Sequence, residues 1–204
     1  MKGASRMIKL LLSLLFGYLF GSLNFAIIYS KLRGDDIRNH GSGNAGATNV
    51  LRTYGKLAAL LVFLLDISKG VISVLIIRSV FDSELLECVT ALGAVLGHNF
   101  PVYYKFTGGK GVSTSFAVLL ILHWQIALIA LATFIITVLL SRYVSLSSIL
   151  ASVAAGISAF ILYSFNEFSV FCLIICILCI IRHHSNIKRL LNGTENKLGQ
   201  KRKD

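Results

Sequence analysis

Charged side chains are scarce in this sequence. Asp, Glu, Lys and Arg make up 14% of the 204 residues, whereas roughly a quarter of the residues in ordinary soluble domains are charged. Hydrophobic residues make up 55%, and a soluble protein of this length could not bury so much apolar surface. The shortage of charge therefore argues against a soluble domain and favours lipid as the solvent.

Proline and linker sequences are also rare. The chain has one proline, no Ser/Gly-rich linker and no internal repeat, so we expect a single domain over residues 1–204. The apolar run 8–19 follows basic residues, as in a signal peptide. No small-residue cleavage site comes after it, so we expect the run to be retained as a helix.

The four cysteines do not indicate a metal site. Cys172, Cys176 and Cys179 have the spacing of an iron–sulfur motif, but they lie in the unbroken apolar run 168–181. Cluster ligands usually come from a loop that can wrap the metal, whereas these side chains would spread round a helix. We expect them and Cys88 to be packing residues, with no metal and no organic cofactor.

Apolar runs predict membrane-spanning helices at about 8–30, 57–80, 86–104, 144–164 and 167–184. The run 112–140 would be about 43 Å long as one helix, against a hydrocarbon core of about 30 Å. His123, Trp124 and Gln125 at its middle suit a membrane interface. This run is therefore either two helices, at about 112–123 and 125–141, or one strongly tilted helix.

The placement of basic residues decides between six and seven helices. Lys and Arg gather in four segments, which are 31–56, 105–110, Arg142 and the tail from Arg182. The remaining connections contain neither residue; they are 81–87, 123–125 and 165–168. Seven helices put every basic connection on one side, so the positive-inside rule predicts an all-α membrane protein with its N-terminus outside and its C-terminus in the cytoplasm. Lys2, Arg6 and Lys9 argue against this orientation but are outnumbered.

A net charge of +11 would indicate nucleic acid as the partner of a soluble protein. Here the basic residues stand at the ends of apolar runs. They are better explained as orientation signals and as contacts for lipid head groups and anionic substrates, with no nucleic acid partner.

A glycine-rich polar segment, residues 40–52, predicts an anion-binding loop. Its three glycines would let backbone N–H groups approach a ligand closely, and a helix starting near Val50 would add its N-terminus. The groups that we expect to contact phosphate are Arg38, Ser42, Gly43, Asn44, Thr48, Asn49 and Arg52. An ordinary surface loop is the alternative, because glycine loops are common.

A second segment contains Gly108, Gly109, Lys110 and Gly111, a compact set of amides with a lysine beside it. This arrangement suits phosphate. It is not a Walker A loop, because Gly111 stands where Ser or Thr should follow the lysine. The alternative for Lys110 is an interfacial anchor. His98, ten residues before Gly108, is equally well explained as a functional or as an interfacial histidine.

Polar residues also follow the fifth and seventh helices. Ser145 is expected either to bind a ligand or, the favoured alternative, to cap the next helix. His183, Asn186 and Arg189 recur every three residues, so they would share roughly one helical face. Gly193 would end an extension of the last helix.

Asp66 and Lys69 lie three residues apart inside the second predicted helix. Charges at that depth are costly, so the two are either a structural ion pair or part of a site. The predicted topology gathers the four polar motifs on the cytoplasmic side, with this pair lying deeper.

Together these stretches resemble the bacterial acyl-phosphate:glycerol-3-phosphate acyltransferase family. The match runs in family order over nearly the whole chain, through Gly21-Ser22, Asp36-Ile37-Arg38, Gly41 to Arg52, Asp66 to Gly70, Gly97-His98, Phe100-Pro101, Gly108 to Val112, Arg142 to Leu146, Arg182-His183, Asn186-Ile187, Arg189-Leu190 and Gly193 to Glu195. Asn24 stands where many members have proline. Thr107 stands where a lysine usually precedes Gly108, and losing that charge would weaken phosphate binding slightly.

The resemblance implies an enzyme of phospholipid biosynthesis with seven transmembrane helices. It would transfer a fatty acyl group from acyl phosphate to the sn-1 hydroxyl of glycerol 3-phosphate, giving 1-acylglycerol 3-phosphate and phosphate. It also implies a bacterial inner (plasma) membrane location, a cytoplasmic active site, membrane lipids as partners and a functional link to the enzyme that forms acyl phosphate.

Acyl phosphate is already activated, so we expect no covalent intermediate, and the chain offers neither a convincing Ser-His-Asp set nor the His-x4-Asp motif of another acyltransferase family. Positioning and charge stabilisation would suffice. Lys110 and the amides of Gly108, Gly109 and Gly111 would hold one phosphate, and Arg38, Ser42 and Arg52 the other. His183 and Asn186 would orient the acceptor hydroxyl, and Ser145 and Arg189 are further phosphate contacts. The hydroxyl proton would go to the acyl phosphate itself, with His183 as the alternative base.

Three other functions fit the sequence less well. A transporter for a phosphorylated metabolite often has repeated halves, which this chain lacks. A CDP-alcohol phosphotransferase needs several aspartates around a metal, whereas only Asp66 lies well inside a helix. A non-enzymatic lipid-binding scaffold would not require so many hydrogen-bonding groups in its loops.

Overall fold

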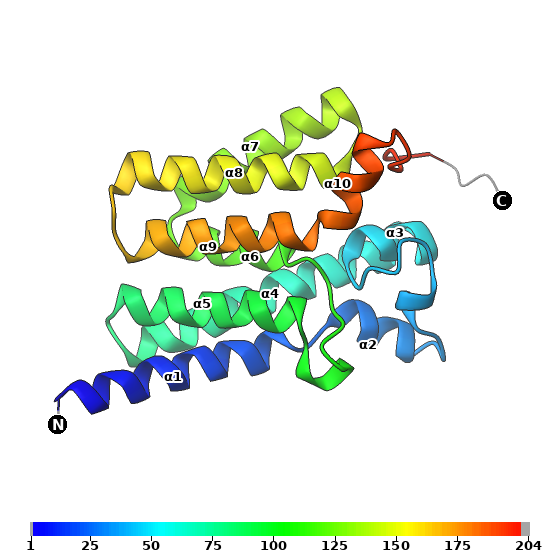
Figure 1. The fold of residues 1–204 in the computed structure, drawn as a ribbon. Helices are drawn as coiled ribbons and strands as arrows, with labels where there is room; N and C mark the ends of the chain where they lie inside the picture. Colours follow the sequence, from blue (N-terminus) through cyan, green and yellow to red (C-terminus); the bar gives the residue numbers. More distant parts are fainter. Residues whose placement is uncertain (1, 201–204) are drawn as a thin grey trace. The chain divides into compact units, whose positions relative to one another are not determined.

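In a computed structural model, which describes residues 2–200, all the regular structure of those residues is helical (Figure 1). The helices are α1 (Lys2–Gly21), α2 (Phe25–Lys31), α3 (Ala47–Tyr54), α4 (Lys56–Val80), α5 (Glu84–Asn99), α6 (Val112–Leu122), α7 (Trp124–Ser141), α8 (Val144–Tyr163), α9 (Glu167–Arg182) and α10 (His184–Leu191). Two 3-10 turns lie at Ile37–Asn39 and Val102–Tyr104. The prediction of an all-α fold is confirmed for these residues. Of the basic residues used to predict orientation, Lys201, Arg202 and Lys203 lie outside the described residues, as does the side chain of Lys2.

The chain divides into two compact units, Met1–Leu122 and His123–Asp204. We call them unit 1 and unit 2 and describe each by itself. Unit 1 contains α1 to α6 and both glycine-rich segments. Unit 2 contains α7 to α10.

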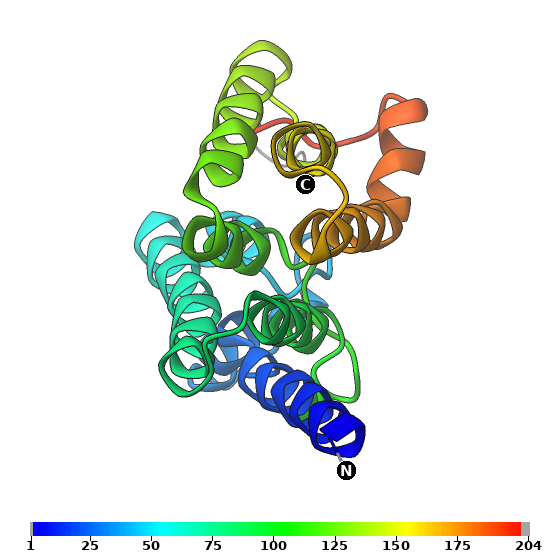
Figure 2. The ribbon, with the colours of Figure 1, turned by 90° about the vertical axis from the view of Figure 1, so that its left-hand side faces the viewer.

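In unit 1, α1 lies against α5 along most of its length (Figures 1 and 2). Glycines make this close approach feasible. A Cβ at Gly17 or Gly21 of α1 would collide with backbone atoms of α5, and a Cβ at Gly93 or Gly97 of α5 would collide with backbone atoms of α1. Each helix therefore presents a pair of glycines four residues apart, the small-residue pattern by which membrane helices pack closely.

Asn24 connects α1 to α2 and ties both to the first glycine-rich segment. Its side-chain oxygen accepts a hydrogen bond from the N–H of Ile27 at 3.1 Å and so caps α2. Its side-chain nitrogen donates to the carbonyl oxygen of Ala45 at 3.2 Å. The asparagine that departs from the family pattern is thus a fully buried cap and brace.

Among the described residues, five helical stretches are long and apolar enough to cross a membrane: 4–31, α4, 84–104, α7 and α8. A sixth is α9 if it is joined with α10, which bends away from it by 58°. The expected extension of the last helix is therefore a separate helix, and Gly193 follows it at φ +69°. The 11 residues of α6 extend only about 16 Å.

The helical break expected near residues 123–125 lies at His123, whose extended backbone precedes α7. Its ring lies 4.1 Å from the ring of Phe168 and 4.2 Å from that of Tyr163, measured between centroids. In the same unit, α8 packs against both α7 and α9. Cys172, Cys176 and Cys179 are buried in α9.

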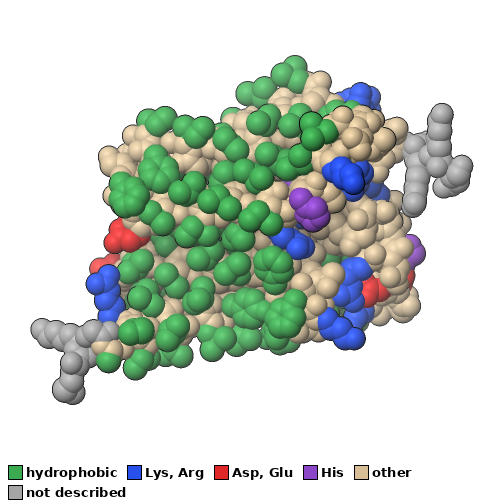
Figure 3. All heavy atoms as spheres, in the orientation of Figure 1, with side chains coloured by type: hydrophobic (Ala, Val, Ile, Leu, Met, Phe, Trp, Pro, Cys, Tyr) green, Lys and Arg blue, Asp and Glu red, His purple; other side chains and the backbone are tan. Residues whose placement is uncertain are grey.

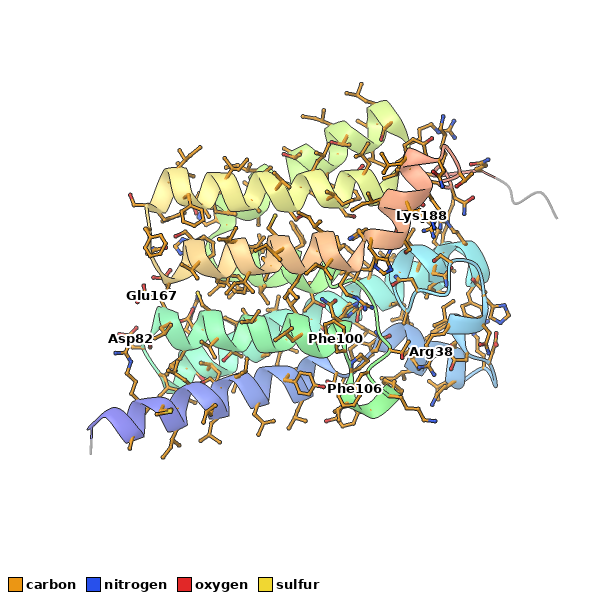
Figure 4. All side chains as sticks on the ribbon, in the orientation of Figure 1. Arg38, Asp82, Phe100, Phe106, Glu167 and Lys188 are labelled. Atoms are coloured by element: carbon orange, nitrogen blue, oxygen red, sulfur yellow. The ribbon has the colours of Figure 1, made fainter. Side chains whose placement is uncertain are left out.

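Charged side chains lie at both ends of each unit. In Figure 4, Asp82 and Arg38 lie at opposite ends of unit 1, and Glu167 and Lys188 lie at opposite ends of unit 2. Large apolar side chains such as Leu60 of α4 and Leu139 of α7 are exposed along the helices between these ends. Figure 3 shows apolar side chains covering much of the visible helical surface, as a lipid-facing protein requires.

Candidate active site

Asn49 organises the first glycine-rich segment from within. Its side-chain oxygen accepts from the N–H of Ser42 at 3.0 Å, and its side-chain nitrogen donates to the carbonyl oxygens of His40 at 2.9 Å and Ile37 at 3.2 Å. The side chain is 1% exposed. Gly41, at φ +56°, lies so close to Asn49 that a Cβ there would collide with the amide oxygen. Asn49 therefore stabilises the loop from inside, in the role we call its brace, and both polar atoms of its side chain are already hydrogen-bonded to the loop backbone.

The surrounding candidates differ in accessibility. Ser42, Gly43 and Arg52 are exposed, whereas Asn44 and Thr48 are half-buried. Helix α3 begins at Ala47, three residues before the position expected from the sequence, with Gly46 as its N-cap. Thr48 and Asn49 thus belong to its first turn.

Arg38 is held by an acidic neighbour. Its Nε and one terminal nitrogen donate to the carboxylate of Asp36 at 2.9 and 2.6 Å, and the other terminal nitrogen donates to the carbonyl oxygen of Tyr104 at 3.2 Å. The Arg38 hydrogen bonds hold the pKa of Asp36 below its ordinary value. Arg38 thus joins the first glycine-rich segment to the loop after α5, with most of its charge compensated by Asp36.

A second brace lies at the outer edge of the same segment. Tyr54 donates its hydroxyl proton to Asp35 at 2.6 Å, and a ring nitrogen of His40 lies 2.8 Å from the same carboxylate. These hydrogen bonds, that of Tyr54 first, lower the pKa of Asp35 to about 2. Burial and the hydrogen bond to Asp35 raise the pKa of Tyr54 to about 12.

The connection 105–111 begins with a hydrogen-bonded turn at Lys105 and Phe106, and its glycines then pack, without regular structure, against the end of α5 and the first segment. We call this connection the glycine turn. The N–H of Gly109 donates to the carbonyl oxygen of His98 at 3.0 Å. A Cβ at Gly108 would collide with that carbonyl, and a Cβ at Gly109 would collide with the Nε2 atom of His98 and the carbonyl oxygen of Ala45. Glycine is thus required by packing at both positions, and Gly109, next to Lys110, lies against Ala45 of the first segment.

A buried ionic cluster lies behind this turn. Lys69 Nζ lies 2.9 Å from a carboxylate oxygen of Asp66, 2.8 Å from the carbonyl oxygen of Leu23 and 3.0 Å from Nδ1 of His98. The side chains of Asp66 and Lys69 are each 1% exposed. Charges this deep are costly unless they are paired and hydrogen-bonded, and these three contacts meet that condition for Lys69.

Asn99, the next residue after His98, was not predicted to be a site residue. It is fully buried, and neither polar atom of its side chain has a hydrogen-bond partner among the described residues. Its amide oxygen would meet a Cβ at Gly111. No local sequence pattern marks a buried asparagine of this kind.

In unit 2, Glu195 gathers three of the predicted site residues. Its carboxylate accepts from Asn186 at 2.7 Å, from Arg189 at 2.7 Å and from the hydroxyl of Ser145 at 2.9 Å. Burial alone would raise the pKa of Glu195, but these hydrogen bonds outweigh it and lower the pKa. Glu195 was predicted only as part of a family motif, with no role of its own. The signal that could have identified it is an acidic residue within a basic tail.

The preferred alternative for Ser145, a helix cap, is wrong. Helix α8 begins at Val144 with Tyr143 as its N-cap and has no side-chain cap. The Ser145 hydroxyl instead donates to Glu195, which lies fifty residues further along the chain. The expected shared face holds for Asn186 and Arg189, since both bind the one carboxylate.

His183 lies at the bend between α9 and α10 and is 2% exposed. Its Nδ1 is 2.8 Å from the carbonyl oxygen of Cys179, which can only accept. Nδ1 must therefore carry a proton. In the neutral ring, Nε2 is then the acceptor, the form suited to receive a hydroxyl hydrogen bond.

These features define a class of protein, namely an integral membrane protein whose polar turns and fixed histidine are suited to anionic substrates. A family model described as glycerol-3-phosphate acyltransferase matches residues 11–193. Glycerol-3-phosphate acyltransferases from Thermoanaerobacter sp. (strain X514) and Coxiella burnetii (strain CbuG_Q212) are each 47% identical to the chain, covering 93% and 92% of it and 96% and 97% of their own lengths.

Solved structures are similar as well. A crystal structure of PlsY (YgiH), an integral membrane glycerol 3-phosphate acyltransferase, in its glycerol 3-phosphate form is 42% identical with a TM-score of 0.88, covering 93% of this chain and 96% of that one. The lysophosphatidic acid form of PlsY is 41% identical with a TM-score of 0.85, covering 93% and 95%. The chain belongs to the glycerol-3-phosphate acyltransferase family, and the family resemblance of the sequence is confirmed.

Proposed function

We propose that this protein transfers a fatty acyl group from acyl phosphate to the sn-1 hydroxyl of glycerol 3-phosphate, forming 1-acylglycerol 3-phosphate and inorganic phosphate in phospholipid biosynthesis. Family membership supports the acyltransfer, and the related PlsY structures are of glycerol 3-phosphate and lysophosphatidic acid forms. The donor and the sn-1 position are carried over from the resemblance of the sequence to the acyl-phosphate-dependent family.

The observation that carries the proposal is the turn at Gly108 and Gly109. Its backbone is held by His98 and Ala45 at positions that tolerate no side chain, with Lys110 directly after it. Backbone amides and an ammonium group in a fixed arrangement stabilise negative charge without reorganising. Because the Gly109 N–H is donated to the His98 carbonyl, Gly109 shapes the turn, and we assign Lys110 with Gly108 and Gly111 to one substrate phosphate.

The exposed groups of the first glycine-rich segment, with Ser42 and Arg52 foremost, are assigned to the other phosphate. Gly43, Asn44 and Thr48 are assigned further contacts there. Arg38 and Asn49 are assigned to stabilising that segment. The Arg38 side chain already binds Asp36 and Tyr104, and the Asn49 side chain already binds the loop backbone.

Unit 2 is assigned the acceptor hydroxyl. His183 and Asn186 orient it, and Ser145 and Arg189 contribute through the Glu195 cluster, in which all three hydrogen bonds meet one carboxylate. The hydroxyl oxygen forms the ester bond with the acyl carbon, and the bond between that carbon and the phosphate oxygen breaks. The hydroxyl proton goes to the departing phosphate, which is both nearby and basic, with His183 Nε2 as the alternative acceptor.

The proposed topology has seven crossings, an external N-terminus and a cytoplasmic site in a bacterial inner membrane. The basic connections of the sequence support the number of crossings and the orientation, and the family resemblance supports the bacterial inner membrane. Helix α6 would be the shortest crossing, with the extended glycine turn before it completing the path through the inner boundary. Acyl phosphate must be supplied by an enzyme that makes it, which is the functional partner that we infer.

The test is purified protein with palmitoyl phosphate and glycerol 3-phosphate, followed for phosphate release, with palmitoyl-CoA in a parallel reaction. We expect release only with the acyl phosphate. Lys110→Ala should abolish transfer, since charge stabilisation of this kind contributes several kcal/mol to the transition state. Lys105→Ala is the matched control, because Lys105 is exposed in the same connection. Near-normal turnover of Lys110→Ala, or equal loss in both variants, would refute the role of Lys110.

A further inference from the structure

The cluster of Asp66, Lys69 and His98 is more specific than a structural ion pair needs to be. A lysine ammonium group has three N–H donors and no acceptor. The three partners of Lys69 Nζ lie within 3.0 Å, and two of them, the Asp66 carboxylate and the Leu23 carbonyl, can only accept. The ammonium group is therefore ion-paired with Asp66 and hydrogen-bonded to the Leu23 carbonyl, and its third contact is completed if His98 Nδ1 accepts.

This arrangement determines the protonation of His98. An imidazole nitrogen that accepts a hydrogen bond carries no proton, so Nδ1 is bare and the neutral ring is protonated at Nε2. The opposite tautomer would set a ring N–H against the ammonium group. His98 is 3% exposed and lies between Lys69 on one edge and the glycine turn on the other.

The Nε2 edge of His98 is the part that reaches the turn. It occupies the volume that a side chain at residue 109 would require, and the backbone of the same histidine binds the Gly109 N–H at 3.0 Å. His98 therefore contacts the turn twice, through its backbone carbonyl oxygen and through its ring. Asp66 and Lys69 face the other edge of the ring, with an Asp66 carboxylate oxygen 3.6 Å and Lys69 Nζ 3.0 Å from Nδ1.

We propose that Asp66, Lys69 and His98 form a positioning relay, in which the buried ion pair fixes His98 as the Nε2–H tautomer and His98 holds the Gly108–Lys110 turn in its phosphate-binding shape. The relay deepens the proposed function and rests on it for the identity of the ligand. Asp66, Lys69 and His98 are positioning residues, because none is assigned a contact with the reacting atoms. A change in the relay should weaken binding of a phosphate substrate more than it slows the chemical step.

The first test is spectroscopic and does not depend on activity. Protein labelled with nitrogen-15 in its histidine rings is examined in lipid nanodiscs at neutral pH, and His98→Gln identifies the His98 signals. The relay predicts an unprotonated Nδ1 and a protonated Nε2. A protonated Nδ1, in either the other tautomer or an imidazolium ion, overturns it. This result stands even if palmitoyl phosphate proves to be the wrong donor.

The second test separates positioning from general support. His98→Gln can place an amide N–H near the position of Nε2, whereas His98→Asn can reach only the position of Nδ1. We expect the KM for a phosphate substrate to change less than threefold in His98→Gln and to rise at least tenfold in His98→Asn. Equal KM values in the two variants contradict the role assigned to the Nε2 edge.

The ion pair is tested by removing both charges together, because either charge alone would be left buried without its partner. Asp66→Asn with Lys69→Met should let the His98 ring adopt a mixture of tautomers and should raise the same KM at least tenfold, with a smaller change in kcat. An unchanged tautomer and KM overturn the relay. If this double variant does not fold, the histidine spectra and the His98→Gln and His98→Asn pair decide the question.

Discussion

Replacing Asn49 by alanine tests whether the first glycine-rich segment is held from within. The change removes one hydrogen bond to the N–H of Ser42 and two to the carbonyl oxygens of His40 and Ile37. At about 1 kcal/mol net for each bond, the loop loses roughly 3 kcal/mol, which corresponds to an increase of about 100-fold in its opening equilibrium. The helices should remain folded, because Asn49 makes these contacts only within the loop.

Amide hydrogen exchange in detergent micelles measures that opening directly. Peptides covering residues 36–49 should exchange about 100-fold faster in Asn49→Ala, whereas peptides from α4 and α5 should be unchanged. The KM for the substrate bound by this loop should rise as well, because only the closed fraction binds. Asn39→Ala is the control, since Asn39 is exposed in the same segment.

Asn49→Asp sharpens the test. It keeps an acceptor for the Ser42 N–H but has no donors for the two carbonyl oxygens, so it should open the loop nearly as much as Asn49→Ala. Loop exchange within threefold of the original protein in both variants would refute the assignment of Asn49 as the brace.

Further predictions concern other parts of the chain. Glu195→Gln should reduce kcat/KM at least tenfold, whereas Glu167→Gln, an exposed control in unit 2, should not. Because the pKa of Glu195 is lowered, the contribution of its carboxylate to kcat/KM should be complete above the ordinary glutamate pKa and be lost only as the pH falls below that value. Tyr54→Phe should raise the pKa of Asp35 from about 2 towards 3.8, so a carbon-13 titration should show the carboxyl protonating at higher pH than before. Asn99→Leu should raise the free energy of unfolding by about 1 kcal/mol or more and leave kcat unchanged, because it removes a buried amide that has no hydrogen-bond partner in the described part of the chain. A lower melting temperature would contradict this.

Apolar runs indicate where helices lie because lipid imposes a simple rule, but the expected helix 8–30 is two helices, α1 and α2, interrupted at residues 22–24. A membrane helix needs a long apolar run, and a polar interruption such as His123 is visible in the residues themselves. The break at His123 was therefore predictable. The bend between α9 and α10 was less so, because no proline or glycine marks His183.

The site was predictable in its residues more than in their roles. Glycine and polar spacing pointed to the segment containing Asn49, but a loop sequence does not say which side chains point inward. Asn49 and Arg38 proved to be engaged with the loop itself. Ser145 was wrongly favoured as a cap, because its partner, Glu195, is distant in sequence and only the folded chain brings the two together.

The charge cluster behind the turn shows the same limit. The spacing of Asp66 and Lys69 indicated an ion pair, and the histidine at 98 was noted separately. Their connection depends on the packing of α4 against α5, which no local pattern encodes. The sequence alone predicts only that the buried charges of Asp66 and Lys69 must be paired.

The most direct test of the proposed reaction follows one oxygen atom. Glycerol 3-phosphate labelled with oxygen-18 in its sn-1 hydroxyl is incubated with the purified protein and palmitoyl phosphate, and both products are examined by mass spectrometry. Acyl transfer to that hydroxyl predicts that the label lies in the ester bond of 1-acylglycerol 3-phosphate and that the released phosphate carries none. Label in an unacylated hydroxyl of the product, or a labelled glycerol bisphosphate accompanied by free palmitate, would contradict the account.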